Sequence, residues 1–199
     1  MKIKVLIFMF IITGLLLNAQ NKKFIYWENL SAQQKIKILN DKNITQYLRD
    51  CYAGKYALDE DIKQTLDLLD SAVRSKDTAS APLYYYLFIR LNSISGGYLS
   101  EVLGCHTVKL LLREPEFIIN HLQIDRLRRG NELNYFVNNL AYEYYMNQTE
   151  TLPGRPGFEI LQEILIDKLK DSSPENKKIL EVLFEKTRNK MEKLIKENK

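Results

Sequence analysis

Residues 173–196, SPENKKILEVLFEKTRNKMEKLIK, show most plainly how this chain folds. Ser173 followed by Pro174 is typical of a helix start, because a serine side chain can cap free backbone N–H groups and proline fits the first turn. Four apolar residues then recur near the 3.6-residue period that places side chains on one helix face: Ile179, Leu183, Met191 and Leu194. We therefore expect a long amphipathic helix that packs this face against a partner surface.

Helical spacing runs through the rest of the sequence as well. Strand signals are nearly absent, because Val, Ile and Thr rarely alternate with polar residues before a tight turn. Glycine or proline interrupts the pattern near residues 54, 96–97, 115 and 147–157. Further helices are expected over residues 31–51, 62–73, 83–94, 99–112, 117–127, 132–146 and 158–169.

These ranges predict an all-α fold: an irregular antiparallel bundle of about seven or eight helices. A stack of helical hairpins resembling a solenoid is the alternative, although no repeat near 34 or 40 residues is evident. No resemblance to a known family is claimed from these residues.

Particular residues are expected on the buried faces of the first two helices. In the helix over residues 31–51 they are Ile36, Leu39, Ile44, Tyr47 and Leu48. In the helix over residues 62–73 they are Ile62, Leu66, Leu69 and Val73. Both sets follow the spacing of one amphipathic face.

The first 20 residues have the three parts of a secretory signal peptide. Lys2 and Lys4 are followed by an apolar run of 13 residues from Val5 to Leu17, and Ala19 supplies the small residue for cleavage. A membrane-spanning helix needs about 20 apolar residues, so cleavage is favoured over a retained anchor. We expect residues 1–20 to be removed, residues 21–199 to form one domain, and the product to be periplasmic or extracellular.

Two thiols, Cys51 and Cys105, would then reach an oxidising compartment. A bridge between them would span 54 positions, for which the chain-entropy model gives about 4 kcal/mol of stabilisation. Both residues also fit as small core side chains inside helices. The sequence is therefore compatible both with a disulfide between Cys51 and Cys105 and with two unbridged thiols.

The charge of the chain is nearly balanced. Of 29 basic residues, 27 remain when Lys2 and Lys4 are removed, against 25 acidic residues. Such a balance does not indicate a nucleic-acid partner.

Motifs for metal, cofactor or covalent chemistry are not evident. Cys105 and His106 are adjacent and would point about 100° apart on a helix, which favours a buried thiol beside a half-exposed histidine over a zinc site. Glu101, Glu143 and Glu159 flank apolar segments and are the candidate acids for a carboxylate-dependent hydrolase.

Tyrosine is the unusual component of the composition, with 12 residues in the chain. Tyr84, Tyr85, Tyr142 and Tyr145 are the candidate binding residues, because tyrosine combines a rigid apolar ring with a polar tip. A broad core between helices explains the same clusters. Tyr84, Tyr85 and Tyr86 cover about 200° of a helix, so at least one ring should lie at a second contact or at the surface.

Three arginines complete the candidate site. Arg126 and Arg129 lie at a predicted helix end, where cations offset the negative end of the helix dipole, and Arg155 lies between two Pro-Gly turns. Guanidinium groups at such positions also suit an acidic partner.

The function expected from these features is that of an exported, non-enzymatic helical protein. It would bind another protein in the bacterial envelope, as an immunity or accessory factor does. The alternative is a carboxylate-dependent peptidoglycan hydrolase. Contact between a membrane surface and residues 174–196 is a third expectation, because lysines flank the apolar row of that helix.

Overall fold

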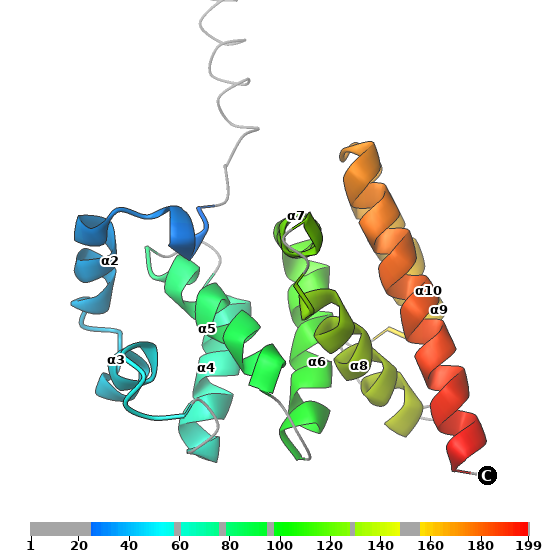
Figure 1. The fold of residues 1–199 in the computed structure, drawn as a ribbon, viewed down its shortest axis with the longest axis horizontal. Coiled ribbons are helices and arrows are strands. Elements are labelled where there is room, and N and C mark those ends of the chain that lie inside the picture. Colours follow the sequence, from blue (N-terminus) through cyan, green and yellow to red (C-terminus); the bar gives the residue numbers. More distant parts are fainter. Residues whose placement is uncertain are drawn as a thin grey trace, which may run out of the picture.

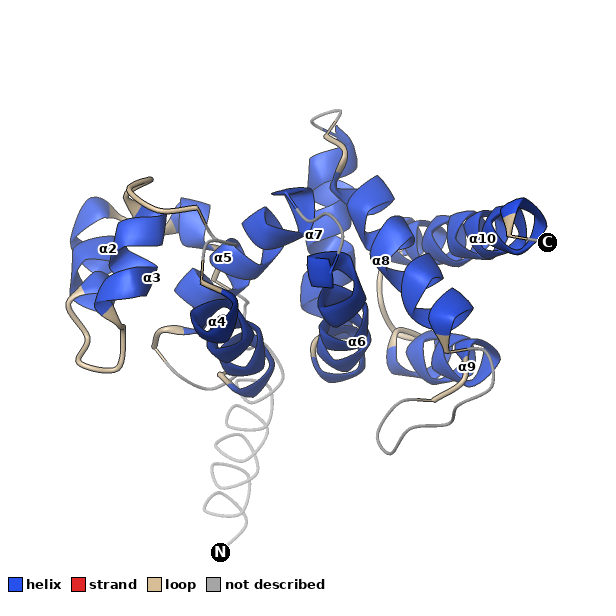
Figure 2. Cartoon of the chain, turned by 90° about the horizontal axis from the view of Figure 1, so that it is seen from below, coloured by secondary structure: helices blue, strands red, loops and turns tan. Residues whose placement is uncertain are grey.

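The computed structural model describes residues 25–57, 61–75, 79–94, 98–127, 130–147 and 156–198, and within these ranges it is helical without strands (Figure 2). The elements are η1 (Trp27–Asn29), α2 (Ala32–Leu39), α3 (Gln46–Tyr52), α4 (Ile62–Arg74), α5 (Ala81–Ile94), α6 (Tyr98–Arg113), α7 (Pro115–Leu127), α8 (Glu132–Met146), α9 (Phe158–Lys168) and α10 (Pro174–Glu197). The predicted all-α fold is confirmed. The predicted signal peptide lies outside the described residues.

The helices follow one another along the longest axis of the molecule (Figure 1). Helices α2 and α3 lie at one end and α9 and α10 at the other, while α4 contacts both α5 and α6. Helix α8 packs against α5, α6, α7 and α10, so most of the core surrounds it. The result is an extended, irregular bundle in which neighbours in sequence are often neighbours in space.

Local capping sets where several helices begin. Ser31 Oγ accepts a hydrogen bond from the Gln34 backbone N–H at 3.3 Å, and the Gln34 side chain accepts from the Ser31 N–H at 2.8 Å. This reciprocal pair is a capping box that satisfies two free donors. Asp61 and Ser173 cap α4 and α10 through their own side-chain oxygens. The predicted cap at Ser173 is confirmed.

The helix predicted over residues 31–51 is wrong, because the structure has two short helices there, α2 and α3. Asp41 Oδ1 accepts from the Asn43 N–H at 2.8 Å, and Thr45 Oγ1 accepts from the Leu48 N–H to start α3. Short polar side chains thus offer the backbone an alternative to the helical ladder. Across the break, Arg49 Nε donates to the Leu39 carbonyl at 2.6 Å.

The predicted buried faces of α2 and α4 are wrong in part. Ile36 and Ile62 are each 57% exposed, whereas Ile38 is buried. In α4 the buried residues are Thr65, Leu68, Leu69 and Ala72. The true face is turned relative to the predicted row, because the position of the neighbouring helices selects which apolar residues are covered.

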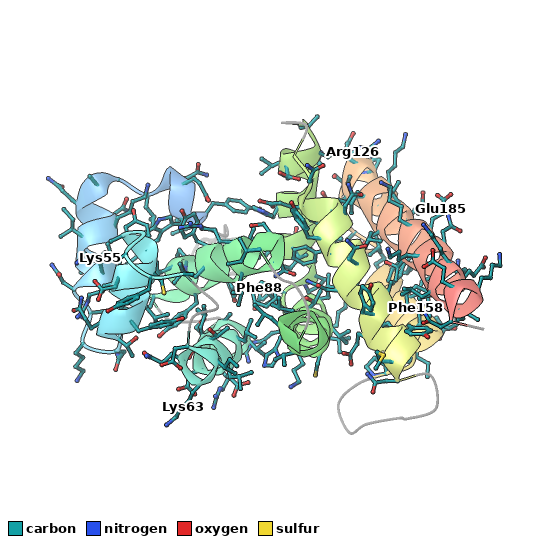
Figure 3. All side chains as sticks on the ribbon, turned by 60° about the horizontal axis from the view of Figure 1, so that its bottom comes forward. Lys55, Lys63, Phe88, Arg126, Phe158 and Glu185 are labelled. Atoms are coloured by element: carbon teal, nitrogen blue, oxygen red, sulfur yellow. The ribbon has the colours of Figure 1, made fainter. Side chains whose placement is uncertain are left out.

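The core is continuous through α5, α6, α8 and α10. Leu83, Leu87 and Phe88 of α5 are fully buried; Phe88 is labelled within the packed interior in Figure 3. Phe136 and Leu140 cover this region from α8. Helix α5 is therefore buried along most of its length.

A buried amide pair joins α5 to α8. Asn139 Nδ2 donates to Asn92 Oδ1 at 2.5 Å, and Asn92 Nδ2 donates to the Phe88 carbonyl at 2.9 Å. Both asparagines are 2% exposed. Since a buried amide costs free energy unless it is paired, this contact favours one register between the two helices.

Cys51 and Cys105 are separate thiols rather than a disulfide. Cys51 is buried in α3, where its Sγ donates to the Ala57 carbonyl at 3.8 Å, while Cys105 is half-buried on α6. The expectation of a buried thiol beside a half-exposed histidine is reversed, because His106 is only 8% exposed. His106 Nε2 lies 3.1 Å from Asp70 Oδ1 and so links α6 to α4.

Candidate functional site

A small pocket lies between η1, α5 and α7 and has a volume of about 70 Å³. Its walls are mostly aromatic and aliphatic, and the charged groups are few. The lining side chains are Ile25, Tyr26, Trp27, Glu28, Pro82, Tyr86, Ile89, Arg90, Phe117, His121 and Glu132. Its position at the junction of three elements makes it a candidate binding site.

The short turn η1 directs its two aromatic residues to different neighbours. The Asn29 N–H donates to the Tyr26 carbonyl at 3.0 Å and thereby closes the turn. The Tyr26 ring stacks on Phe117 of α7 with the centroids 5.2 Å apart, and Trp27 lies 6.0 Å from Tyr86 of α5. The pocket is therefore built by tertiary packing of rings from distant parts of the chain.

One acid and one base of the lining are already partnered. His121 Nε2 hydrogen bonds to Glu132 Oε2, which joins α7 to the start of α8. The Glu132 backbone N–H donates to Asp125 Oδ2 at 2.9 Å. The His121 and Glu132 side chains are 15% and 26% exposed, so this pair forms a partly buried wall of the pocket.

The electrostatics around Tyr26 are negative. Burial, and then the carboxylates of Glu116 and Glu28, raise the pKa of Tyr26 to about 12. The hydroxyl therefore stays neutral at physiological pH, and the wall that it forms is an uncharged ring near two carboxylates. Another charged residue of the lining, Arg90, has its Cζ 5.8 Å from the centre of the Tyr86 ring.

Tyr84 and Tyr85 lie in the core and not at a surface. They are 9% and 4% exposed, and the Tyr85 ring packs on Phe117 at 4.6 Å between centroids. Burial raises the pKa of Tyr84. Tyr86 is the ring of this cluster that reaches a second contact, because it borders the pocket.

Tyr142 and Tyr145 lie on the side of α8 that faces away from the core. Tyr142 is 38% exposed and Tyr145 is half-buried. The helical spacing groups them with three further residues that are exposed or half-buried: Tyr135, Asn138 and Met146. We call these five residues the outer face of α8.

The predicted arginines are not brought together with the tyrosines in the described part of the chain. Arg126 is exposed in the last turn of α7, at the edge of the molecule in Figure 3. It lines neither the pocket between η1, α5 and α7 nor the groove described below. Arg129 and Arg155 lie outside the described residues.

The candidate acids differ in their surroundings. Glu143 is 4% exposed, and a Cβ built on Gly104 of α6 would lie 2.7 Å from its Cβ. Glu159 is exposed and accepts from Arg188 Nη2 at 3.2 Å. Neither lines the pocket or the groove, and the side chain of Glu101 lies outside those described. No group of three His, Cys, Asp or Glu side chains suited to a metal ion occurs among the described residues.

An open polar groove of about 630 Å³ lies between α3 and α4. Two carboxylates line it. The Gln46 amide and then Lys55 lower the pKa of Asp50, and the Gln64 side chain and backbone lower the pKa of Asp61. Both are ionised at neutral pH, with hydrogen-bond partners from their own neighbourhood.

Sequence reasoning missed the residues of the pocket. Trp27 is the only tryptophan of the chain, and it directly follows Tyr26. This aromatic pair, close to the predicted signal peptide, was the one sequence feature that could have pointed to the pocket. The contributions of Phe117, His121 and Glu132 depend on how α7 and α8 pack against η1 and α5.

No protein-family model, curated protein or solved structure matches the chain. Among the described residues no helix has the length and apolar character needed to span a membrane.

Proposed function

We propose that this chain is an exported, non-enzymatic helical protein that binds another protein of the bacterial envelope through the outer face of α8. An immunity or accessory factor is the kind of protein meant. The observation that carries the proposal is the composition of that face. It presents three tyrosines and a methionine, and it contains no charged side chain.

This composition departs from that of the whole chain, in which 27% of residues are charged. From Leu133 to Met146 the only charged residue is Glu143, and its side chain is buried toward α6. The centres of protein interfaces are depleted in charge and enriched in Tyr and Met. The outer face of α8 therefore has the chemistry expected of an interface centre.

The exposure of individual residues supports the same interpretation. Met146 is 60% exposed, and Tyr142 lies one helical turn before it on the same row. A tyrosine ring covers a large area while losing little rotamer entropy, and its hydroxyl can bond to a partner. At one border of the face, Lys186 Nζ donates to Asn134 Oδ1 at 3.1 Å, which supplies a polar rim.

Helix α8 is also a rigid support for this face. Its opposite side packs Phe136 and Leu140, both fully buried, against the core. Tyr144 is held between these sides, since its ring packs on Phe158 at 5.3 Å and its hydroxyl donates to the Pro156 carbonyl at 3.2 Å. Little ordering of the helix would be needed on binding, which favours affinity.

The test is capture of a partner from periplasmic extract by the purified mature protein, with a Tyr142→Ser/Met146→Ser double variant beside it. The captured protein is then identified, purified and titrated against each form. The double variant should bind at least about tenfold more weakly, as truncation of interface hot spots does. Ile166→Ser is the matched control, because Ile166 is 53% exposed and lies on α9 rather than on α8.

Capture of no partner under mild conditions would contradict the proposal. Equal affinity of the double variant and the Ile166→Ser control would contradict it too, because the outer face of α8 would then not carry the binding. Circular dichroism of each variant separates a loss of binding from a loss of folding.

A further inference from the structure

The pocket between η1, α5 and α7 has a size that restricts its occupant. Sites for metabolites and cofactors usually measure about 300–1,000 Å³, whereas this pocket measures about 70 Å³. A cavity needs about 10–15 Å³ of such volume to hold one water molecule, so the room corresponds to about five to seven heavy atoms. A single side chain that projects from a larger molecule is therefore the size of group that fits.

The walls favour a side chain with an apolar stem. Ile25, Pro82 and Ile89 supply aliphatic surface, and the rings of Tyr26 and Phe117 stack at 5.2 Å to form one side. Such surfaces accept methylene groups, and the faces of aromatic rings additionally attract cations.

The charges near the pocket favour a cationic tip on that stem. Within the described part of the chain, Arg90 is placed over the Tyr86 ring and His121 is bonded to Glu132, so both basic groups of the lining are engaged. Glu28 and Glu116 are exposed, lie near Tyr26 and form no ion pair with another described residue. Among the described residues, these two carboxylates beside a pocket with aromatic walls therefore have no ion-pair partner.

We propose that this pocket binds an arginine or lysine side chain of a partner polypeptide. The stem would lie against Ile25, Pro82 and Ile89, and the cationic tip would lie between the ring faces and the carboxylates of Glu28 and Glu116. A guanidinium over Tyr86 already shows this mode of contact within the chain itself. The pocket shares no residue with the outer face of α8, so either proposal can fail alone.

Trp27 gives a direct readout, because it borders the pocket and is the only tryptophan of the chain. The probes are two blocked tripeptides, acetyl-Gly-Arg-Gly-amide and the same peptide with citrulline, which keeps the shape of arginine without its charge. The full mature protein is titrated with each while tryptophan emission is recorded. The arginine peptide should change the emission saturably at millimolar concentration, as expected for one side chain, and the citrulline peptide should not.

The variants Glu28→Gln and Glu116→Gln should each weaken this binding about two- to fivefold, which is the range of a solvent-exposed ion pair. Raising the salt concentration should weaken it in the unchanged protein as well. Glu192→Gln, an exposed position on α10, is the matched control and should bind like the unchanged protein. Tyr142→Ser should also leave the response unchanged, because it alters only the outer face of α8.

Several results would overturn the proposal. They are an equal response to the arginine and citrulline peptides, no response to either, and unchanged affinity when both Glu28 and Glu116 are replaced. Because both glutamates are exposed, their replacement should leave the helical circular dichroism spectrum intact. A change in peptide response can then be assigned to the pocket rather than to unfolding.

Discussion

Replacement of Gly104 by alanine is expected to destabilise the chain, although alanine is the better helix former. Gly104 lies within α6 at its contact with α8. A Cβ at this position would lie 2.7 Å from Glu143 Cβ and 2.9 Å from the Asn139 carbonyl oxygen. Real Cβ atoms do not approach other heavy atoms so closely, so the two helices would have to separate.

Helix propensity and overpacking have opposite effects on the stability of the Gly104→Ala variant, and their sizes decide whether it gains or loses stability. Alanine in a helix interior gains about 1 kcal/mol over glycine. Overpacking of a filled core costs about 1–3 kcal/mol, and the upper part of that range applies because neither a Cβ nor a backbone carbonyl can rotate away. The net loss should be about 1–2 kcal/mol, which for a domain of this size lowers Tm by about 2–8 °C.

Urea and thermal denaturation followed by circular dichroism measure this change. Gly157→Ser is the control, because a Cβ at Gly157 meets nothing within 4 Å and serine is preferred at this helix cap. That variant should be as stable as the unchanged chain or slightly more so. If Gly104→Ala were equally stable, the close approach of α6 and α8 would be refuted.

Three further predictions concern the described core and its charges. Asn139→Leu removes the partner of the buried Asn92 amide and should cost about 1–3 kcal/mol in urea denaturation. The Gln64 side chain holds the pKa of Asp61 below its ordinary value. The Asp61 carboxylate therefore stabilises the fold fully above its pKa in the unfolded chain, and this stabilisation is lost as the pH falls through its pKa in the folded chain. Asp61→Asn should accordingly flatten the acid side of a plot of Tm against pH. Cys51 and Cys105 should both react with a thiol reagent in denaturant without reductant, and unreactive thiols would contradict the structure.

Helix positions were largely predictable from the sequence because their signals are local. The bounds predicted for α8, residues 132–146, agree with the structure, and Ser173 caps α10 as expected. Capping residues, proline and glycine act within a few positions, so they can be recognised without knowing the rest of the fold.

The division between α2 and α3 shows where local signals misled. Apolar residues continue through residues 31–51 at helical spacing, and this periodicity outweighed the polar residues 40–43 in the prediction. In the structure Asp41 and Thr45 bond to nearby backbone N–H groups and so end one helix and begin another. Asp41 and Thr45 could either lie within a continuous helix or bond to the backbone and interrupt it, and periodicity alone does not distinguish these two outcomes.

The candidate site was predictable only in part. Tyr84 and Tyr85 resemble Tyr142 and Tyr145 in sequence, since each pair lies in an aromatic cluster on a helix. The first pair is buried because other elements cover α5, while the second faces away from the core because the partners of α8 pack on its other side. This distinction depends on tertiary neighbours, and so does the stacking of Tyr26 on Phe117 from a distant helix.

The position of α8 makes the proposed binding face separable from the stability of the fold. Its inner side packs into the core through Phe136 and Leu140, which are fully buried, whereas Tyr142 and Met146 are exposed. Exposed substitutions usually change stability by less than about 0.5 kcal/mol, while truncation of a buried phenylalanine costs about 3–5 kcal/mol. A variant of Tyr142 and Met146 that loses the partner but keeps its melting temperature would therefore place the function on the outer face. A variant that loses both would indicate that these side chains support the core instead.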